Sequence, residues 1–238
     1  MMSPGLPMFH RRNVAALIPA YFEADHIGDV VRRTRLQVDR VLVVDDGSAD
    51  ETAAVARAAG AEVVRHEANQ GKGTALKTGL RILGERPGVE FILMLDGDGQ
   101  HLPEEIPAFL EAASRSEARC LVGSRMKDLA GMPWLRRITN LSMSAYISAV
   151  CGQAVADTQC GFRMVHRDWV GALVDCPSRQ FEFETEMLVT LSRLGCKIDS
   201  LPVSTVYGTE KSKIQSVHDT IRFIKLMWRL QRARPERD

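Results

Sequence analysis

The aspartates Asp96 and Asp98 are the residues of this chain best suited to chemistry. They follow residues 91–95, an apolar run that predicts a buried strand. In an open α/β sheet, ligands bind at the carboxyl ends of the strands. Two carboxylates there suit Mg²⁺ or Mn²⁺, which take oxygen ligands and leave coordination positions open for substrate phosphate oxygens. Because two aspartates at this spacing often occur by chance, the position after a strand carries the prediction of a metal site.

Three other predicted strands are also followed by polar residues. Residues 14–18 lead into Pro-Ala-Tyr-Phe-Glu at 19–23, residues 41–44 lead into Asp-Asp-Gly-Ser-Ala-Asp at 45–50, and residues 62–65 precede Asn-Gln-Gly-Lys-Gly at 69–73. Taken singly, these segments are typical of helix caps and tight turns. Because the carboxyl ends of parallel strands meet at one sheet edge, the segments together predict a polar rim that offers hydrogen bonds to a nucleotide, a lysine to a phosphate and a bridging metal ion.

The chain lacks the sequence patterns of several other folds that bind phosphates or hydrolyse esters. It has no G-x-G-x-x-G after the first predicted strand and no G-x-x-x-x-G-K-[ST], which disfavours a dinucleotide-binding Rossmann domain and a P-loop hydrolase. No serine lies in a G-x-S-x-G elbow. Five cysteines without a C-x-x-C pair argue against a disulfide framework and a zinc site, and they fit a cytoplasmic protein.

The elements that must position these residues alternate between strand and helix in the first half of the chain. Strands are predicted at 14–18, 41–44, 62–65, 91–95 and 119–122, with helices beginning at Ile27 and spanning 50–59, 74–83 and 103–114. This alternation predicts an α/β fold with a mostly parallel, twisted sheet and helices on both faces. In the second half we expect helices near 143–150, at 184–194 and at 214–230, and an edge strand over 197–206 interrupted by Pro202. We expect a single domain over 1–238, with flexible tails at 1–12 and 231–238.

The overall charge gives no reason to expect a nucleic-acid partner. The formal net charge of the 238 residues is +1. Residues 1–12 have no apolar core of signal-peptide length. The uncharged run at 138–156 contains several polar side chains, so we expect a buried or interfacial helix there rather than a membrane span.

The motifs, taken in order, resemble the inverting glycosyltransferases of family 2, which have the GT-A fold. The residues that carry this resemblance are Ile-Pro-Ala-Tyr at 18–21, Val-Val-Asp-Asp-Gly-Ser-Ala-Asp at 43–50, Asn-Gln-Gly-Lys-Gly at 69–73 and Asp-Gly-Asp-Gly-Gln at 96–100. Gly-Ser-Arg at 123–125, the residues Arg136, Arg137 and Asn140, and Asp-Thr-Gln-Cys-Gly-Phe-Arg at 157–163 resemble the dolichol-phosphate mannosyltransferase branch. The likeness runs from about residue 14 to residue 224, and it implies transfer of a sugar, with inversion, from a nucleotide-sugar donor to a polyprenyl phosphate.

The resemblance also implies a role for individual residues. The residues implied to bind the donor are Pro19, Tyr21, Glu23, Asp46, Lys72 and Asp96. Those implied to hold Mg²⁺ or Mn²⁺ are Asp96, Asp98 and Gln100, and those implied to bind the acceptor phosphate are Arg125, Arg137 and Arg163. Asp98 and Asp157 are the implied catalytic carboxylates, and Lys211 and Lys213 are implied to close over the donor diphosphate.

Several alternatives stay open at this stage. Asp157 could cap a helix or pair with Arg163, and it could orient the acceptor, because a phosphate is already anionic near neutral pH. The acidic residues Glu182, Glu184 and Glu186 could favour the start of a helix or close the sugar pocket. An acceptor with a neutral hydroxyl, soluble or on a protein, would need a true base. A non-catalytic nucleotide-sugar-binding subunit is a further alternative, and a nucleotidyltransferase is disfavoured because the loop after the first strand is not rich in glycine.

A lipid acceptor would require the protein to reach a membrane. The apolar face around Met143, Tyr146, Ile147 and Val150 and the basic helix at 214–230 are candidates for peripheral docking on the cytoplasmic side. Alternatively, a membrane subunit could supply the anchor, and the C-terminal helix could pack on the domain. The sequence does not choose among GDP-mannose, UDP-glucose and other UDP-sugars as the donor.

Overall fold

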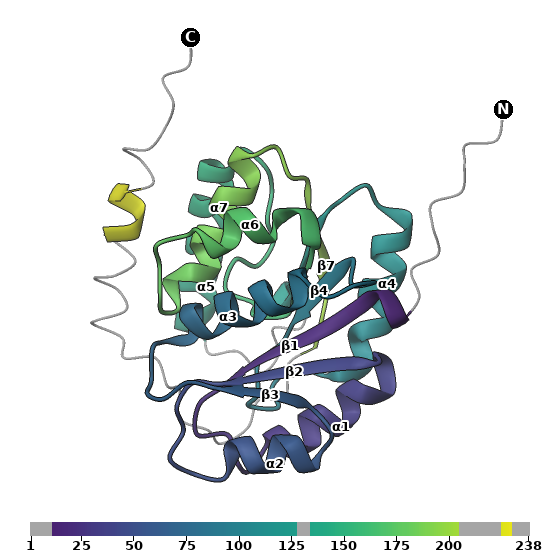
Figure 1. Ribbon diagram of the computed structural model, residues 1–238. Helices are drawn as coiled ribbons and strands as arrows, with labels where there is room; N and C mark the ends of the chain where they lie inside the picture. The colour runs from purple at the N-terminus through teal and green to yellow at the C-terminus, as the bar shows by residue number, and fades with distance from the viewer. Residues whose placement is uncertain (1–10, 128–133, 205–224, 230–238) are drawn as a thin grey trace, which may run out of the picture.

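A single mixed sheet forms the centre of the molecule. The computed structural model describes residues 11–127, 134–204 and 225–229. Within these residues the sheet has seven strands in the order β3-β2-β1-β4-β6-β5-β7, and helices cover both of its faces (Figure 1). The expected α/β architecture is therefore confirmed.

The strands are β1 (Val14–Ala20), β2 (Arg40–Asp45), β3 (Glu62–Arg65), β4 (Phe91–Met94), β5 (Cys120–Ser124), β6 (Arg163–His166) and β7 (Ile198–Pro202). The helices are α1 (Ile27–Gln37), α2 (Thr52–Ala58), α3 (Lys72–Gly84), α4 (Ile106–Arg115), α5 (Trp134–Cys151), α6 (Val170–Val174) and α7 (Glu182–Arg193). Short 3-10 turns are η1 (Arg11–Asn13), η2 (Pro103–Glu105), η3 (Arg125–Lys127) and η4 (Arg167–Trp169).

Strand β6 is the one antiparallel member of the sheet within the described residues. It runs between β4 and β5 and is antiparallel to both, whereas the other strand pairs are parallel. This strand is not among those predicted from the sequence. Its four residues include Arg163, a side chain that is rarely buried, so the segment does not show the apolar pattern of an inner strand. The sheet is nevertheless mostly parallel, as expected.

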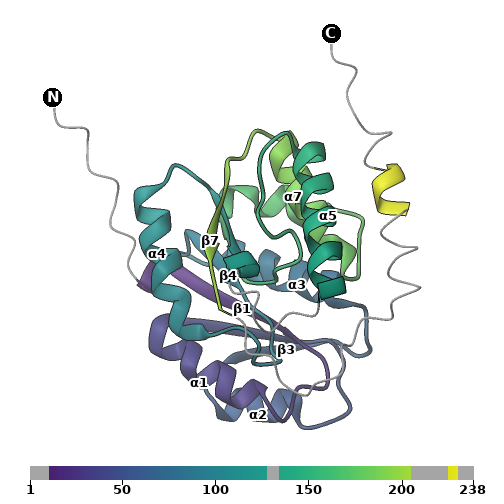
Figure 2. The same ribbon diagram turned by 180° about the vertical axis from the view of Figure 1, so that it is seen from behind.

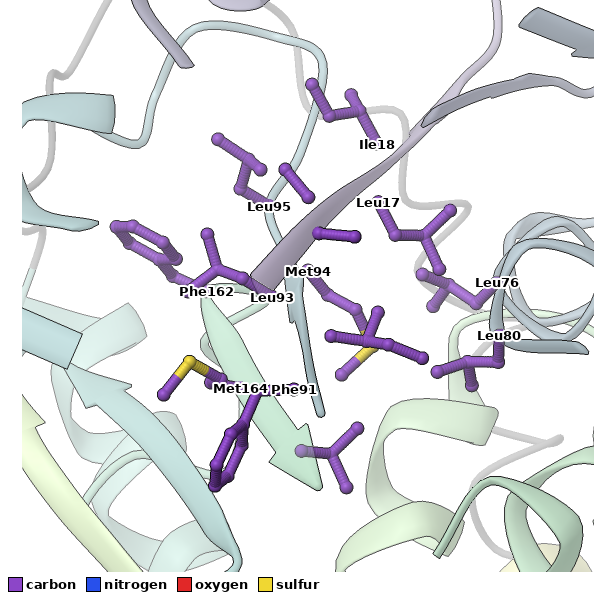
Figure 3. Close-up of a cluster of buried hydrophobic side chains, with 14 of the residues drawn as sticks. Leu17, Ile18, Leu76, Leu80, Phe91, Leu93, Met94, Leu95, Phe162 and Met164 are labelled. Atoms are coloured by element: carbon purple, nitrogen blue, oxygen red, sulfur yellow. The ribbon is translucent and has the colours of Figure 1, made fainter. Parts of the chain in front are cut away.

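The core lies where α3 packs on the central strands. The side chains of Leu17 on β1 and of Leu76 and Leu80 on α3 come together there (Figure 3). A Cβ atom at Gly79 would lie 2.0 Å from Leu17 Cδ1, so only glycine permits this close approach of helix to strand. Helices α1 and α2 cover the opposite face of the sheet (Figure 2). This packing fixes the start of α3 next to the carboxyl ends of β1 and β4.

The ends of several elements differ from the predictions in ways that bear on function. Helix α3 begins at Lys72, two residues earlier than predicted, because Gly71 with φ of +100° turns the chain directly into the helix. Strand β7 ends at Pro202, which has no N–H for a ladder hydrogen bond. Of the helix predicted at 214–230, only residues 225–229 fall within the described part. No described helix is long and apolar enough to cross a membrane.

Candidate active site

The loops that follow β1, β2 and β4 meet at one edge of the sheet. β1 lies between β2 and β4 and is parallel to both, so the three carboxyl ends are adjacent. The backbone N–H of Asp46 donates to Ala20 O at 2.9 Å, and the N–H of Leu95 donates to Leu17 O at 3.2 Å. Because the chain leaves β1 towards β2 and later returns to β4 on the other side, this edge is a topological switch point, where α/β sheets bind their ligands.

Asp96 is held in place by Lys72 and His101. Lys72 Nζ lies 2.7 Å from Asp96 Oδ1, and His101 Nε2 lies 3.5 Å from Asp96 Oδ2. Burial alone would raise the pKa of Asp96, but Lys72 and His101 outweigh burial and hold the pKa well below its usual range. A Cβ atom at Gly161 would lie 2.7 Å from Asp96 Oδ2. Asp96 is therefore ionised and fixed in position between α3 and the segment around Gly161.

Asp98 is the carboxylate whose environment calls for a cation. Burial and the negative charge of Asp96 raise the pKa of Asp98, and its Oδ1 accepts a hydrogen bond from Gln100 N at 3.0 Å. Two carboxylates so close repel each other, and a divalent cation between them would remove that repulsion. The residues thus fit Mg²⁺ or Mn²⁺.

The protein alone supplies only part of the ligand set that a divalent ion needs. Among the described residues, no three His, Cys, Asp or Glu side chains are arranged to hold a metal ion by themselves. This agrees with the chemistry of Mg²⁺, which is held by one or two carboxylates and completes its coordination with water and substrate phosphates. The amide oxygen of Gln100 stays a predicted third ligand.

Lys72 is positioned by two acidic residues from distant parts of the chain. Besides Asp96, its Nζ lies 3.2 Å from both carboxylate oxygens of Glu184, and it lies 5.6 Å from the centre of the Phe181 ring. Burial alone would lower the pKa of Lys72, but the two carboxylates raise it above its ordinary value. Lys72 is therefore a half-buried, fully charged cation. Glu184, which the sequence analysis left open between two roles, belongs to this site.

The predicted donor-binding residues of the first loop lie beside the aspartates. A Cβ atom at Gly97 would lie 3.4 Å from Pro19 O and 3.5 Å from Glu23 Cγ. Pro19 and Glu23 are buried, whereas the Tyr21 side chain is exposed at the rim. The N–H of Glu23 donates to Thr52 Oγ1 at 2.9 Å, which ties this loop to the start of α2. The structure brings these three residues together; their contact with a donor stays a prediction.

Asp46 organises the loop that leads into Lys72. Its carboxylate accepts hydrogen bonds from Gln70 N at 2.9 Å and from Gly71 N at 2.7 Å, and His66 Nδ1 lies 2.7 Å from Oδ1. The side chain is buried. These internal partners make Asp46 a residue that shapes the site, and its predicted contact with the nucleotide is not tested.

Arg125 and Asp157 form a buried, two-pronged ion pair. Arg125 Nε donates to Asp157 Oδ2 at 2.7 Å and Nη2 donates to Oδ1 at 3.1 Å, while Arg125 N also lies 3.3 Å from Oδ2. Burial alone would raise the pKa of Asp157, but Arg125 lowers it below its ordinary value. Asp157 therefore pairs with Arg125, and neither of the two alternatives considered for it, a helix cap or a partner of Arg163, describes its main contact.

The segment that carries Asp157 is fastened to α5. Two serines one helical turn apart hold it: Ser144 Oγ accepts from Thr158 N at 3.1 Å, and Ser148 Oγ accepts from Val155 N at 3.0 Å. Ser144 and Ser148 thus fix the position of the segment at 155–158 against α5.

Arg163 has a different role from the one predicted. Its side chain is 1% exposed, and it donates to the backbone oxygens of Thr158 (2.9 Å), Cys160 (2.7 Å) and Glu184. A guanidinium so occupied by carbonyl groups supports the loop at 158–160 and the start of α7, and the prediction that it binds the acceptor phosphate does not fit this arrangement. Sequence motifs cannot separate the two roles, because both require an arginine at this position.

The remaining predicted residues cannot be placed. Arg137 belongs to α5, but its side chain lies outside the described part of the chain, and so do Lys211 and Lys213. Two residues at the site were missed. His101 follows the Asp-Gly-Asp-Gly-Gln motif directly, and Gly161 lies inside a motif whose glycine had no assigned role.

A family model for "Glycosyl transferase family 2" matches residues 15–174. This range contains Asp96, Asp98, Lys72, Arg125 and Asp157.

Relatives in the curated proteins have related names. The chain is 30% identical over 205 residues to the undecaprenyl-phosphate mannosyltransferase of Micrococcus luteus, covering 81% of this chain and 83% of the relative. It is 28% identical over 236 residues to the UDP-N-acetylglucosamine–dolichyl-phosphate N-acetylglucosaminyltransferase of Methanococcus voltae, covering 90% of this chain and 93% of the relative.

Among solved structures, the glucosyl-3-phosphoglycerate synthase of Mycobacterium tuberculosis has the same fold. It superposes with a TM-score of 0.71 at 20% identity, covering 94% of this chain and 82% of the neighbour. That enzyme has been crystallised with Mn²⁺, uridine diphosphate and phosphoglyceric acid. At this identity the likeness establishes the GT-A architecture. With the sheet-edge aspartates and the family match over residues 15–174, it follows that the chain is a glycosyltransferase and belongs to glycosyl transferase family 2.

Proposed function

We propose that this protein transfers a sugar from a nucleotide-sugar donor to a polyprenyl phosphate, with inversion at the anomeric carbon. The observation that carries the proposal is the segment from Asp157 to Gly161. One end binds Arg125, and the other end touches Asp96. Four residues of extended chain span at most about 14 Å, so an arginine suited to a second phosphate lies close to the carboxylates suited to the donor.

The donor half of the site is built around charge. Asp96 and Asp98, with Gln100 as a third ligand, would hold Mg²⁺ or Mn²⁺, and the ion when bound supplies positive charge that stabilises the departing diphosphate. Lys72 adds a fixed cation next to Asp96. Tyr21 at the rim and the loop around Pro19 and Glu23 would border the nucleoside. The name of the Methanococcus voltae relative, which includes UDP-N-acetylglucosamine, supports a nucleotide-linked sugar as donor, and the two names differ in the sugar that is transferred.

The acceptor half relies on Arg125. Its planar fork matches the oxygens of a phosphate, and a cation there offsets the repulsion between the acceptor phosphate and the donor diphosphate. The pair with Asp157 fixes the orientation of the guanidinium through its Nε and Nη2 atoms. Arg137 would join this half, whereas Lys211 and Lys213 would close over the donor diphosphate.

Asp157 acts here as a positioning residue. A phosphate monoester has a second pKa of about 6, so the attacking oxygen is already anionic near neutral pH and needs no base. The carboxylate of Asp157 is engaged by Arg125, and its lowered pKa makes it a poor proton acceptor. This arrangement favours a phosphate acceptor over a neutral hydroxyl, for which a free base would be required.

The lipid acceptor would be reached by peripheral contact with a membrane. The face of α5 predicted for docking is mostly turned inward, because Ile147 packs with Val189, Leu226 and Met227. Tyr146, one of the four residues predicted for docking, is exposed together with Ile138 and Leu141, and no charged residue lies between positions 138 and 156. We assign the surface formed by Ile138, Leu141 and Tyr146 to the bilayer.

One of the C-terminal cations, Arg229, is engaged within the domain. Arg229 Nη2 lies 2.6 Å from Glu186 Oε1 and donates to Ser178 Oγ at 2.9 Å, so it fastens residues 225–229 to α7.

The cysteines Cys120, Cys151, Cys160, Cys176 and Cys196 are all free thiols, which supports a reducing compartment on the cytoplasmic side.

The test is a transfer assay with defined components. Purified protein is incubated with Mn²⁺, a short-chain polyprenyl phosphate and a panel of GDP-mannose, UDP-glucose and UDP-N-acetylglucosamine. One donor should yield a glycosyl-phosphoryl-lipid whose anomeric configuration is opposite to that of the donor. Absence of such a product with every donor, or a product with the donor's configuration, would contradict the proposal.

A further inference from the structure

A hollow lies away from the sheet edge, on the outer face of α3. It has a volume of about 560 Å³, within the range of small-molecule sites, and its lining includes Gln70, Thr74, Lys77, Thr78, Arg81 and Arg179. The four α3 residues among these are spaced at i, i+3, i+4 and i+7, so they share one face of the helix. Buried Leu76 and Leu80 lie on the face that packs on the sheet. The hollow is therefore separated from Asp96 by the body of the helix.

The charge of this hollow is one-sided. Lys77, Arg81 and Arg179 line it, and none of its lining residues is acidic. Burial lowers the pKa of Lys77, Glu186 acts in the opposite direction, and Arg179 and Arg81 lower the pKa further. Lys77 Nζ also donates one hydrogen bond to Cys176 O at 2.8 Å, which leaves two of its three donors. The nearest acidic groups of α7 are engaged elsewhere: Glu184 binds Lys72, and Glu186 binds Arg229 and Ser178 N. Three close cations without a carboxylate between them favour an anion.

The walls of the hollow also offer neutral hydrogen-bonding groups suited to phosphate oxygens. Thr74 Oγ1 donates to Gln70 O at 3.1 Å, and its oxygen keeps acceptor capacity. Thr78 Oγ1 lies 3.1 Å from His66 Nε2, and His66 in turn contacts Asp46. The same loop that Asp46 fastens, at Gln70 and Gly71, thus forms one wall of the hollow and leads into Lys72 on the other side.

We propose that this hollow is a binding site for a phosphorylated small molecule, separate from the donor site and in contact with the loop that positions Lys72. The three cations would hold the phosphate, and Gln70, Thr74 and Thr78 would contact its neutral part. The site does not depend on the identity of the sugar acceptor. Gln70 lines the hollow, and its backbone N–H donates to Asp46. A ligand in the hollow would therefore contact the loop that positions Lys72 in the active site.

The test measures binding to metal-free protein, so that the donor site is disabled. In EDTA, isothermal titration is carried out with inorganic phosphate, pyrophosphate and glucose 6-phosphate. Amide shifts in NMR spectra of ¹⁵N-labelled protein locate the site. The two pocket variants are Arg81→Gln and Arg179→Gln, which replace exposed side chains. The control is Arg57→Gln, which removes one exposed arginine from α2, outside the hollow. Asp98→Asn reports on the donor site.

We expect at least one probe to bind, with shifts at Thr74 and Thr78. Each pocket variant should weaken binding about tenfold, since a charge-assisted contact is lost, while Arg57→Gln and Asp98→Asn bind like the wild type. Binding of no probe, equal binding by all variants, or weakening by Asp98→Asn would overturn the proposal. No donor or acceptor takes part in the measurement, so its failure would leave the proposed transfer reaction unaffected.

Discussion

Asp98 carries the metal assignment at the scale of a single side chain. Its half-buried carboxylate lies near the charge of Asp96, and partial burial together with that charge raises the pKa of Asp98. The folded state therefore binds more protons at Asp98 than the unfolded state does. Without metal, ionisation of Asp98 lowers the unfolding free energy as the pH rises from the ordinary pKa of an aspartate to the raised pKa of the folded state. A bound cation would reverse the effect.

Replacing Asp98 by Asn should separate stability from metal binding. In EDTA, the difference in unfolding free energy between variant and wild type should shift in favour of Asp98→Asn as the pH rises, because the isosteric amide carries no charge. Mn²⁺ with uridine diphosphate at about 100 times Kd should add about 2.7 kcal/mol to the wild type and little to the variant. The exposed carboxylate of Asp175 gives the matched control, Asp175→Asn. Equal stabilisation of Asp98→Asn and wild type would remove Asp98 from the metal site.

The Arg125–Asp157 pair yields a second prediction at this scale. Breaking one half of a buried ion pair leaves an uncompensated charge, so Arg125→Gln and Asp157→Asn should each lower the unfolding free energy by about 3 kcal/mol. The double variant should recover much of that loss, because no buried charge remains.

Activity should follow a different pattern from stability. The double variant should keep a raised acceptor KM, by about tenfold or more, with the donor KM unchanged, because the phosphate contact is still missing. If the double variant recovers both stability and acceptor KM, the pair has only a structural purpose.

At the scale of elements, the loop before β6 links the two halves of the site. Gly161 leaves no room for a side chain, since its Cβ position lies 2.7 Å from Asp96 Oδ2. Gly161→Ala should therefore displace Asp96 and weaken binding of Mn²⁺ with uridine diphosphate about tenfold, a loss typical of disturbing the residues that orient a metal ligand. Gly171→Ala on α6 is the control, because its Cβ position meets no atom within 4 Å. Mn²⁺ with uridine diphosphate is titrated into both variants. Equal affinities of the two variants would show that a side chain at position 161 does not disturb Asp96.

The elements also show how far the sequence predicts this site. Asp96, Asp98 and Lys72 were predicted to converge because each follows a strand of a parallel sheet, and the period of the apolar residues marks those strands. The contact of Lys72 with Glu184 and the pair of Arg125 with Asp157 join residues far apart in the chain, and local patterns do not reveal such pairings. The family resemblance implied a phosphate-binding role for Arg163. Its burial against three carbonyl groups depends on the antiparallel strand β6, which the sequence pattern does not show.

At the scale of the whole molecule, the outer face of α5 should determine membrane contact. Leu141 and Tyr146 are 44% and 41% exposed on a helix face without charge. The variant Leu141→Gln/Tyr146→Gln should reduce co-sedimentation with anionic liposomes about tenfold or more, since burial of each side chain contributes about 1.5–3 kcal/mol. Leu36→Gln on α1 removes an equally apolar and more exposed side chain elsewhere and should leave co-sedimentation unchanged. Equal losses for both variants would mean that binding follows general surface hydrophobicity.

The measurement that tests the central claim most directly compares two acceptors that differ only in the phosphate. Initial rates of sugar transfer are determined with a polyprenyl phosphate and with the polyprenol of the same chain length, at the same donor and Mn²⁺ concentrations. Because Arg125 presents a fixed cation and Asp157 is engaged by it, transfer to the phosphate is expected at a rate at least about a hundredfold higher than to the alcohol. Equal or faster transfer to the alcohol would contradict the assignment of Arg125 and Asp157 to a phosphate acceptor.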